Sequence, residues 1–113
     1  MLGFRVSDIP GYIENIIYLE LKSRGYEIWL GDNDGKEVDF IAKKEGKLIY
    51  IQATTALDGE DVIEREFGNL KGIPDNYPKY VVVLNKKPLD SDIDGIRCLS
   101  LKDFLLLEDL QRP

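Results

Sequence analysis

The sequence predicts an α/β domain in which helices flank a mixed central β-sheet. Two strand-like runs, residues 36–42 and 47–54, meet at a Gly-containing turn and predict an antiparallel hairpin. A continuous apolar run over residues 80–84 is typical of a strand buried on both faces. Helical patterns surround these runs and give the element order αβββαββα. A meander followed by a crossover helix and a buried strand implies a mixed sheet with helices on its faces.

The first element is a helix over residues 9–24. Ser7 or Asp8 can cap its start, and Pro10 suits its first turn. Gly25 follows at a position where helices commonly stop. The apolar stripe that would face the core contains Ile9, Ile13, Ile16 and Ile17.

The later elements are recognised by the same periodicities. They are strands over residues 26–30, 36–42 and 47–54, a helix over 61–70, strands over 80–84 and 96–99, and a final helix over 101–110. Residues 31–35 and Glu45-Gly46 are the predicted turns between the first three strands. Pro74-Asp75 spells the letters of a nuclease motif, but two prolines and an Asx-type side chain predict a turn there.

Composition indicates a single cytosolic domain over residues 1–113. Hydrophobic residues at 43% and charged residues at 32% are ordinary for a globular protein. The sequence shows no apolar run near the roughly 18 residues of a membrane span, and no charged-then-apolar leader. The single cysteine, Cys98, lies in an apolar run, so we expect a buried thiol and no internal disulfide.

The absence of histidine excludes several classes of enzyme. Ser-His-Asp and Cys-His catalysis, His-ligated zinc and histidine general-base nucleases all need that side chain. Any metal would be a hard cation with oxygen ligands. The formal net charge of −6 also argues against tight nucleic-acid binding by this domain alone, because Lys and Arg contacts to phosphates drive most non-specific binding.

Polar side chains in the hairpin form a candidate site. Because successive strand residues face opposite sides, we expect Asp39 on the face away from Val38, Phe40 and Ala42. Gln52 and Thr54 project together from the next strand. Antiparallel pairing about the turn then places Asp39 close to Gln52.

Two acids of the first helix also need an explanation. Glu20 falls within the apolar stripe, so it requires a Lys or Arg partner, a metal, or a tip that reaches solvent. Glu14 lies at the edge of the stripe beside Leu21, where a solvated helix-edge acid is the ordinary role.

The chain resembles the C-terminal PD-(D/E)xK nuclease-like domain of an uncharacterised family of bacterial and archaeal P-loop ATPases. The resemblance covers nearly the whole chain and implies a restriction-endonuclease-like fold. It also implies an upstream ATPase module as a partner, so residues 1–8 look like the start of an excised or remnant domain. The segments that carry it are GYIENIIYLELKSRGYEI, KEVDFIA, IYIQAT, IEREFGNL, IPDNYPKYVVVLN and GIRCLSLKDFLL.

The first helix also resembles that of archaeal Holliday-junction resolvases, in which a helix Glu joins the metal site. By resemblance, Glu14 takes the helix acid position, Asp39 the strand Asp, Gln52 the Glu position and Thr54 the Lys position. These four residues are the implied catalytic set. Glu20 and Arg65 are candidate helpers; Arg65 lies between Glu64 and Glu66, where a solvated or ion-paired arginine is the ordinary role and a position next to Gln52 the alternative. Glu14 and Asp39 are then the implied ligands of a weakly bound Mg²⁺ or Mn²⁺.

Gln52 and Thr54 depart from the family pattern. The missing glutamate would complete a cation cage, and the missing lysine would stabilise charge and position the attacking water. A neutral amide oxygen can bind a hard cation, but with less electrostatic attraction. A lysine from elsewhere in the sequence could replace the missing one, the candidates being Lys22, Lys36 and Lys43.

Three functions remain open on the sequence alone. The first is a degenerate, non-catalytic nuclease-fold domain that serves an ATPase as a recognition or regulatory module for nucleic acid or protein. The second is an active metal-dependent DNA endonuclease with a displaced lysine. The third is a protein-interaction module. The Gln-x-Thr pair favours the first and third, whereas Glu14 and Asp39 keep the second open.

Overall fold

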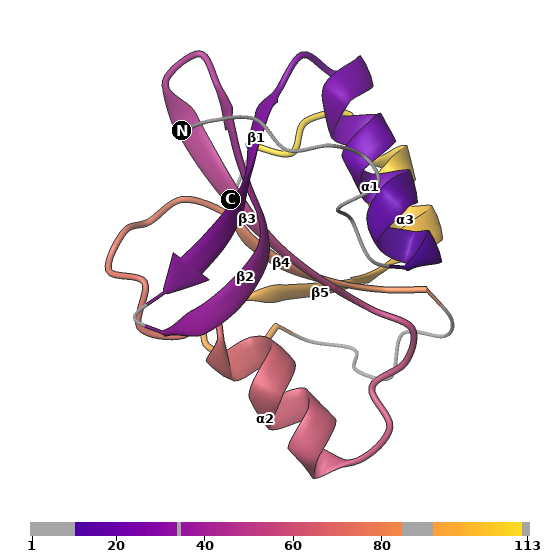
Figure 1. Cartoon of the computed structure of the whole chain (residues 1–113), viewed down its shortest axis with the longest axis vertical. Helices are drawn as coiled ribbons and strands as arrows, with labels where there is room; N and C mark the ends of the chain where they lie inside the picture. Colours follow the sequence, from indigo (N-terminus) through magenta and orange to yellow (C-terminus); the bar gives the residue numbers. More distant parts are fainter. Residues whose placement is uncertain (1–10, 34, 85–91, 112–113) are drawn as a thin grey trace.

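The computed structural model describes residues 11–33, 35–84 and 92–111 and has the predicted mixed α/β architecture (Figure 1). The element order αβββαββα is confirmed. The elements are α1 Tyr12–Ser23, β1 Glu27–Asn33, β2 Lys36–Lys44, β3 Lys47–Thr54, α2 Glu60–Gly68, β4 Lys79–Val83, β5 Arg97–Ser100 and α3 Leu101–Leu106. Within the described ranges, no helix is long and apolar enough to cross a membrane.

The strands form one five-stranded mixed sheet in the order β1-β2-β3-β4-β5. The pairs β1/β2 and β2/β3 are antiparallel, and β3/β4 and β4/β5 are parallel. Glu45 and Gly46 connect β2 to β3 with φ values of 54° and 79°, the two left-handed residues that a tight hairpin turn needs. A parallel neighbour needs a crossover, which α2 supplies between β3 and β4.

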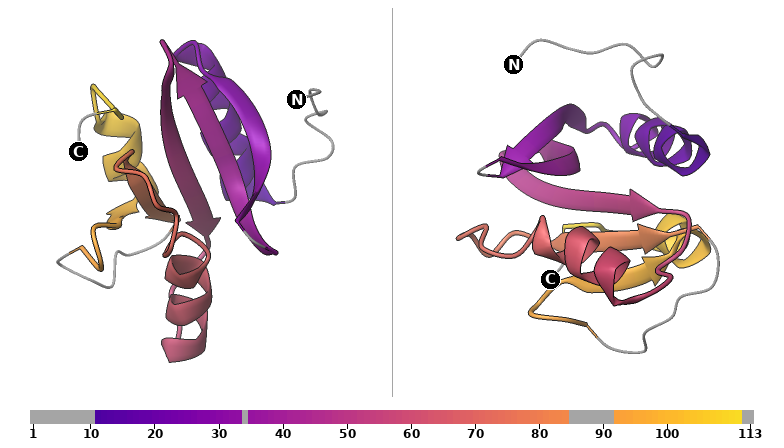
Figure 2. Two further views of the ribbon diagram at one scale, coloured as in Figure 1. Left: turned by 90° about the vertical axis from the view of Figure 1, so that its left-hand side faces the viewer. Right: turned by 60° about the horizontal axis from the view of Figure 1, so that its bottom comes forward.

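Helices cover both faces of the sheet. α1 and α3 pack on one face, against a core that includes Phe40, Ile51 and Tyr80. α2 packs on the other face, where Phe67 contacts a second core that includes Tyr50 and Cys98. In the right-hand view of Figure 2, β3 runs between α1 above and α2 below. The buried thiol expected at Cys98 is confirmed.

The expected alternation of side chains along β2 is wrong at one point. Phe40 and Ala42 share a face as predicted, and α1 and α3 cover that face, but Val38 packs in the core on the α2 side. The cause is a bulge, because the register shifts between the pairs Trp29↔Ile41 and Gly31↔Val38. β2 advances three residues where β1 advances two, so one extra residue reverses the faces. Asp39 lies within this bulge.

Some predicted boundaries also move. β1 does not end at residue 30, because residues 31–33 continue the ladder with β2. α1 begins at Tyr12, since the preceding Gly11 has a φ of 82° that no helix accommodates. The caps predicted at Ser7 and Asp8, together with Ile9 and Pro10, lie outside the described residues.

The ends of the first and last helices differ in outcome. Gly25 follows α1 with a φ of 89°, as expected for a helix stop. α3 ends at Leu106 instead of residue 110, because Leu107 is extended. Leu110 is still buried, and its carbonyl accepts a hydrogen bond from the Tyr80 hydroxyl at 2.6 Å.

Candidate functional site

The candidate site lies where β2 and β3 separate. Their ladder runs from Lys44↔Lys47 to Phe40↔Ile51, and side chains continue the hydrogen bonding beyond it. The backbone N–H of Asp39 donates to Oε1 of Gln52 at 2.6 Å. The backbone N–H of Ala53 donates to Oδ2 of Asp39 at 2.8 Å. The structure therefore brings Asp39 and Gln52 together through one direct hydrogen bond, and a second one joins the Asp39 carboxylate to the backbone of the residue after Gln52.

Gln52 also joins this strand end to α2. Its side chain is buried, with 2% of the residue exposed, and its Nε2 donates to Oε2 of Glu66 at 3.4 Å. Glu66 is 8% exposed. One amide thus accepts from β2 and donates to α2, so both of its polar atoms have partners. We call these two hydrogen bonds the Gln52 bridge.

Burial dominates the electrostatics of the two acids. Burial raises the pKa of Asp39 to about 6, with a contribution from the charges of Glu14 and Glu37, against the opposing hydrogen bond from Ala53. Burial likewise raises the pKa of Glu66 to about 7. Asp39 and Glu14 add to that shift, and the Arg65 guanidinium opposes it. Three acids from α1, β2 and α2 therefore interact around Gln52.

Glu14 reaches this cluster from the first turn of α1. Its carboxylate folds back over Gly11, where an added Cβ would lie 2.7 Å from Glu14 Oε1. Only glycine fits there without displacing the carboxylate. An acid at the start of a helix also interacts favourably with the helix dipole, so Glu14 has a structural role beside its electrostatic one.

The other predicted site residues have separate partners. The Thr54 hydroxyl donates to the Ala56 carbonyl at 3.2 Å, which directs it toward the loop after β3. Glu20 forms an ion pair with Arg24 at 2.7 Å, so its place in the apolar stripe is explained by a salt bridge. Arg24 in turn donates to the Leu105 carbonyl and connects α1 to α3.

Arg65 meets the site indirectly. Its guanidinium lies 3.6 Å from Oε1 of Glu66, while 65% of its side chain is exposed. It therefore touches the acid that Gln52 holds, and not Gln52 itself.

Of the three candidate replacement lysines, the two whose side chains the structure describes do not lie at the site. Lys22 is exposed in the last turn of α1. Lys43 is exposed beside the hairpin turn, four residues and roughly 13 Å along the strand from Asp39. The side chain of Lys36 lies outside the described part of the chain.

Glu66 is the functional candidate that the sequence reasoning missed. The signal was present, because Glu66 falls within the stripe formed by Ile63, Phe67 and Leu70 on α2. The same argument identified Glu20 on the first helix. The bulge that aims Asp39 had no comparable local signal, since it depends on the register with β1.

The donor set does not fit the divalent cation that the fold resemblance implies. The carbonyl oxygen of Gln52 accepts from Asp39, and Oδ2 of Asp39 accepts from Ala53. Over residues 11–33, 35–84 and 92–111, no three acidic, Cys or His side chains are grouped so that they could hold a metal ion. A cation cage would need these hydrogen bonds to break first.

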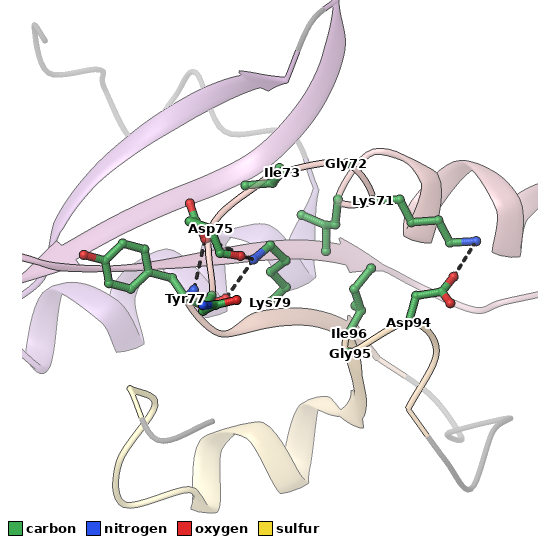
Figure 3. A pocket seen from close by; sticks show the side chains of 11 residues that line it. Lys71, Gly72, Ile73, Asp75, Tyr77, Lys79, Asp94, Gly95 and Ile96 are labelled. Atoms are coloured by element: carbon green, nitrogen blue, oxygen red, sulfur yellow. Dashed lines mark hydrogen bonds and ion pairs between the residues drawn. The ribbon is translucent and has the colours of Figure 1, made fainter.

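A depression of about 470 Å³ is lined by residues 70–73 and 75–77, by Lys79 at the start of β4 and by residues 94–96 (Figure 3). Asp75 is its central residue and confirms the predicted turn, since the Tyr77 N–H donates to its Oδ1 at 3.0 Å. Burial opposes ionisation of Asp75, but hydrogen bonds from Tyr50 and Lys79 outweigh it and lower the pKa of that carboxyl. Lys79 donates to three oxygens of residues 75 and 77. Asp75 and Lys79 are thus engaged in the hydrogen bonds of the turn, which indicates a structural role.

Comparison with known proteins gives one informative relative. No family model matches the chain. An uncharacterized protein of Haemophilus influenzae is 34% identical over 105 residues, which are 93% of this chain and 25% of that protein. The chain thus spans about a quarter of the length of the relative that it matches.

Proposed function

We propose that this chain is a degenerate nuclease-fold domain that recognises nucleic acid or protein without cleaving it. The observation that carries the proposal is the Gln52 bridge. The amide stands where the resemblance implies a metal-binding glutamate, and both of its polar atoms are already engaged. A group held in this way supports a structural role at the position where a nuclease needs a ligand.

The remaining contacts of the site support the same proposal. Thr54 stands at the lysine position, and its hydroxyl donates a hydrogen bond to the Ala56 carbonyl in the following loop. A hydroxyl carries no positive charge with which to stabilise a leaving phosphate oxygen. Asp39 retains its carboxylate, but one oxygen accepts the Ala53 N–H and so fixes the end of the hairpin.

The proposed partner is a P-loop ATPase module. The similarity to the Haemophilus influenzae protein covers a quarter of that protein, which leaves room there for a further module. An attached recognition domain would deliver a target to such a motor or regulate it. This part of the proposal rests on the resemblance of the sequence segments and on the length of the relative.

The second candidate is an active Mg²⁺- or Mn²⁺-dependent DNA endonuclease. The specific observation in its favour is the pair of raised pKa values, about 6 for Asp39 and about 7 for Glu66. Strongly shifted acids in one cluster are common at catalytic sites, and a cation would relieve their mutual repulsion. It would need a rearrangement that frees Asp39 and Gln52 from each other.

A cleavage assay separates the two candidates. The unmodified domain is incubated with Mn²⁺ and single-stranded, duplex and branched DNA, with Asp39→Asn as the matched variant. We expect no cleavage by either protein. Manganese-dependent cleavage that disappears in Asp39→Asn would establish the enzyme and refute the proposed function.

A converse arm tests whether chemistry can be restored. The double variant Gln52→Glu/Thr54→Lys places a carboxylate and an ammonium at the two departing positions. We expect its Mn²⁺ affinity to rise above that of the unmodified domain, for which binding at millimolar concentration or weaker is expected from the low charge of its donor set. Titration calorimetry measures both affinities, and micromolar binding by the unmodified domain would contradict the expectation.

A further inference from the structure

The amide and the acid that contact each other at this site come from β3 and α2. The resemblance implies an acid at position 52 of β3, yet β3 carries the amide of Gln52. The acid in contact with that amide is Glu66, which comes from α2. The motif pattern assigns no role to Glu66, although only 8% of the residue is exposed.

We propose that Gln52 takes over the cohesive role of a bound cation by linking Asp39 of β2 to Glu66 of α2. In this arrangement Gln52 is a positioning residue for Asp39 and Glu66. The inference rests on the proposed non-catalytic function and adds to it the device that holds the site together.

The hydrogen-bonding chemistry explains why an amide can do this. A hard divalent cation such as Mg²⁺ links oxygen ligands. The bridge must instead connect an N–H group of Asp39 to a carboxylate of Glu66, so it needs one acceptor and one donor. A glutamine side chain supplies both, whereas an ionised glutamate only accepts. The contacts of 2.6 Å to Asp39 and 3.4 Å to Glu66 match this division of roles.

Because Gln52 is buried, the loss of its donor or its acceptor would leave a polar group without a partner. Gln52 is enclosed to 2% exposure, and the described residues leave no buried side-chain N or O atom without a partner. An ionised glutamate at position 52 would face Glu66 across the same contact. The two charges would repel one another unless a proton or a cation came between them.

The test is an exchange of the two side chains. Four proteins are compared: the unmodified domain, Gln52→Glu, Glu66→Gln and the double variant Gln52→Glu/Glu66→Gln. Melting temperatures are measured at pH 8 with and without 1 mM MnCl₂. The exchanged pair has the composition and formal charge of the unmodified chain, so it isolates the arrangement of the contact from its charge.

We expect Gln52→Glu to lower the melting temperature by roughly 10 °C, because a buried acid replaces a satisfied amide. The double variant should recover at least half of that loss, since the amide introduced at position 66 can donate to the carboxylate introduced at position 52. Mn²⁺ should raise the melting temperature of Gln52→Glu, in which two acids face each other, and leave the unmodified domain unchanged.

Two control variants match the chemical changes elsewhere. Gln111→Glu makes the same amide-to-acid change at a side chain that donates to the Lys44 carbonyl at 2.9 Å. Glu64→Gln makes the reverse change at an exposed position of α2. Neither should show a melting temperature that depends on Mn²⁺.

Each outcome decides the proposal. A double variant no more stable than Gln52→Glu, or one that does not fold, overturns the proposal that the contact between positions 52 and 66 holds the site together. Stabilisation of the unmodified domain by Mn²⁺ that Glu66→Gln abolishes overturns the role of Gln52 as a cation substitute. If Gln52→Glu does not fold and the double variant does, the rescue itself supports the proposed role of this contact. Failure of the proposed function is read separately, from DNA cleavage that depends on Asp39.

Discussion

Asp39 and Glu66 give the domain a stability that depends on pH. Burial raises their pKa values from the usual 3.8 and 4.5 to about 6 and about 7. The folded state therefore holds protons that the unfolded chain releases at lower pH. The stability linked to these protons is fully present below about pH 4 and is lost as the pH rises through 6 and 7.

The measurement is the urea midpoint of unfolding between pH 4 and pH 8 at constant salt. We expect the midpoint to fall across this range and to level off toward pH 8, about one unit above the pKa of Glu66. Asp39→Asn should flatten the curve, because it removes one titrating group and the charge that acts on Glu66. Asp32→Asn, at an exposed position of β1, is the control and should leave the slope unchanged. A midpoint that rises from pH 5 to pH 7 would contradict the assignment.

Asp75 titrates in the opposite sense. Its pKa is lowered, so the stability that it contributes is lost only as the pH falls below the ordinary carboxyl range. Asp75 therefore contributes to the acid limb of the stability curve, whereas Asp39 and Glu66 contribute to the limb between pH 4 and pH 7.

The bulge in β2 sets the direction of the Asp39 side chain. The close approach of β2 to β1 at this bulge requires a residue without a Cβ at position 31. A Cβ at Gly31 would lie 2.5 Å from Cδ1 and 2.7 Å from Cγ1 of Ile41. We expect Gly31→Ala to destabilise the domain by about 1–3 kcal/mol through overpacking. Urea unfolding measures the loss.

Gly68→Ala is the matched control for that substitution. Gly68 ends α2, and nothing lies within 4 Å of an added Cβ there. The change should be neutral or stabilising, because alanine favours the helix over glycine by up to about 1 kcal/mol. Equal losses from Gly31→Ala and Gly68→Ala would show that the close approach at the bulge carries no energetic weight.

The elements that could be predicted from sequence are those with local signals. Period-two alternation and the Glu45-Gly46 turn predicted the β2–β3 hairpin, which forms with its expected bounds on β3. The apolar run that became β4 predicted a buried strand for a similar reason. Each depends on residues close together in the chain.

The elements that could not be predicted depend on distant partners. The bulge arises from the pairing of β1 with β2, so the face of Val38 could not be read from β2 alone. The end of β1 was misplaced because polar residues 31–33 look like a turn until β2 is there to pair with them. Of the site, the strand positions were accessible from sequence, whereas the contact with Glu66 depends on where α2 docks.

The charge of the whole chain sets its behaviour toward nucleic acid. With a formal net charge of −6, the isolated domain should bind a duplex oligonucleotide with a Kd of about 10⁻⁵ M or weaker at physiological salt. Raising the salt concentration should weaken even that binding. Fluorescence anisotropy at two salt concentrations measures both effects. Tight binding that is insensitive to salt would indicate recognition by contacts other than phosphate neutralisation.

The Gln52 bridge also bears on the order in which the molecule folds. The β2–β3 hairpin closes over a two-residue turn, whereas Gln52 meets Glu66 only after α2 has docked on the sheet. Local contacts form at a lower entropic cost than distant ones, so the hairpin should belong to the folding nucleus and the bridge should form after the transition state. The buried amide therefore stays hydrated until late in folding.

Stopped-flow folding and unfolding rates test this order. Glu66→Ala, which removes the acceptor, should mainly speed unfolding and leave the folding rate within about twofold. Gly46→Ala, which strains a turn residue with a φ of 79°, should mainly slow folding. The reverse pattern would place α2 in the nucleus. In the expected order, the contact between Gln52 and Glu66 slows unfolding. The lifetime of the native state then depends on Glu66, a side chain that the strand motif does not include.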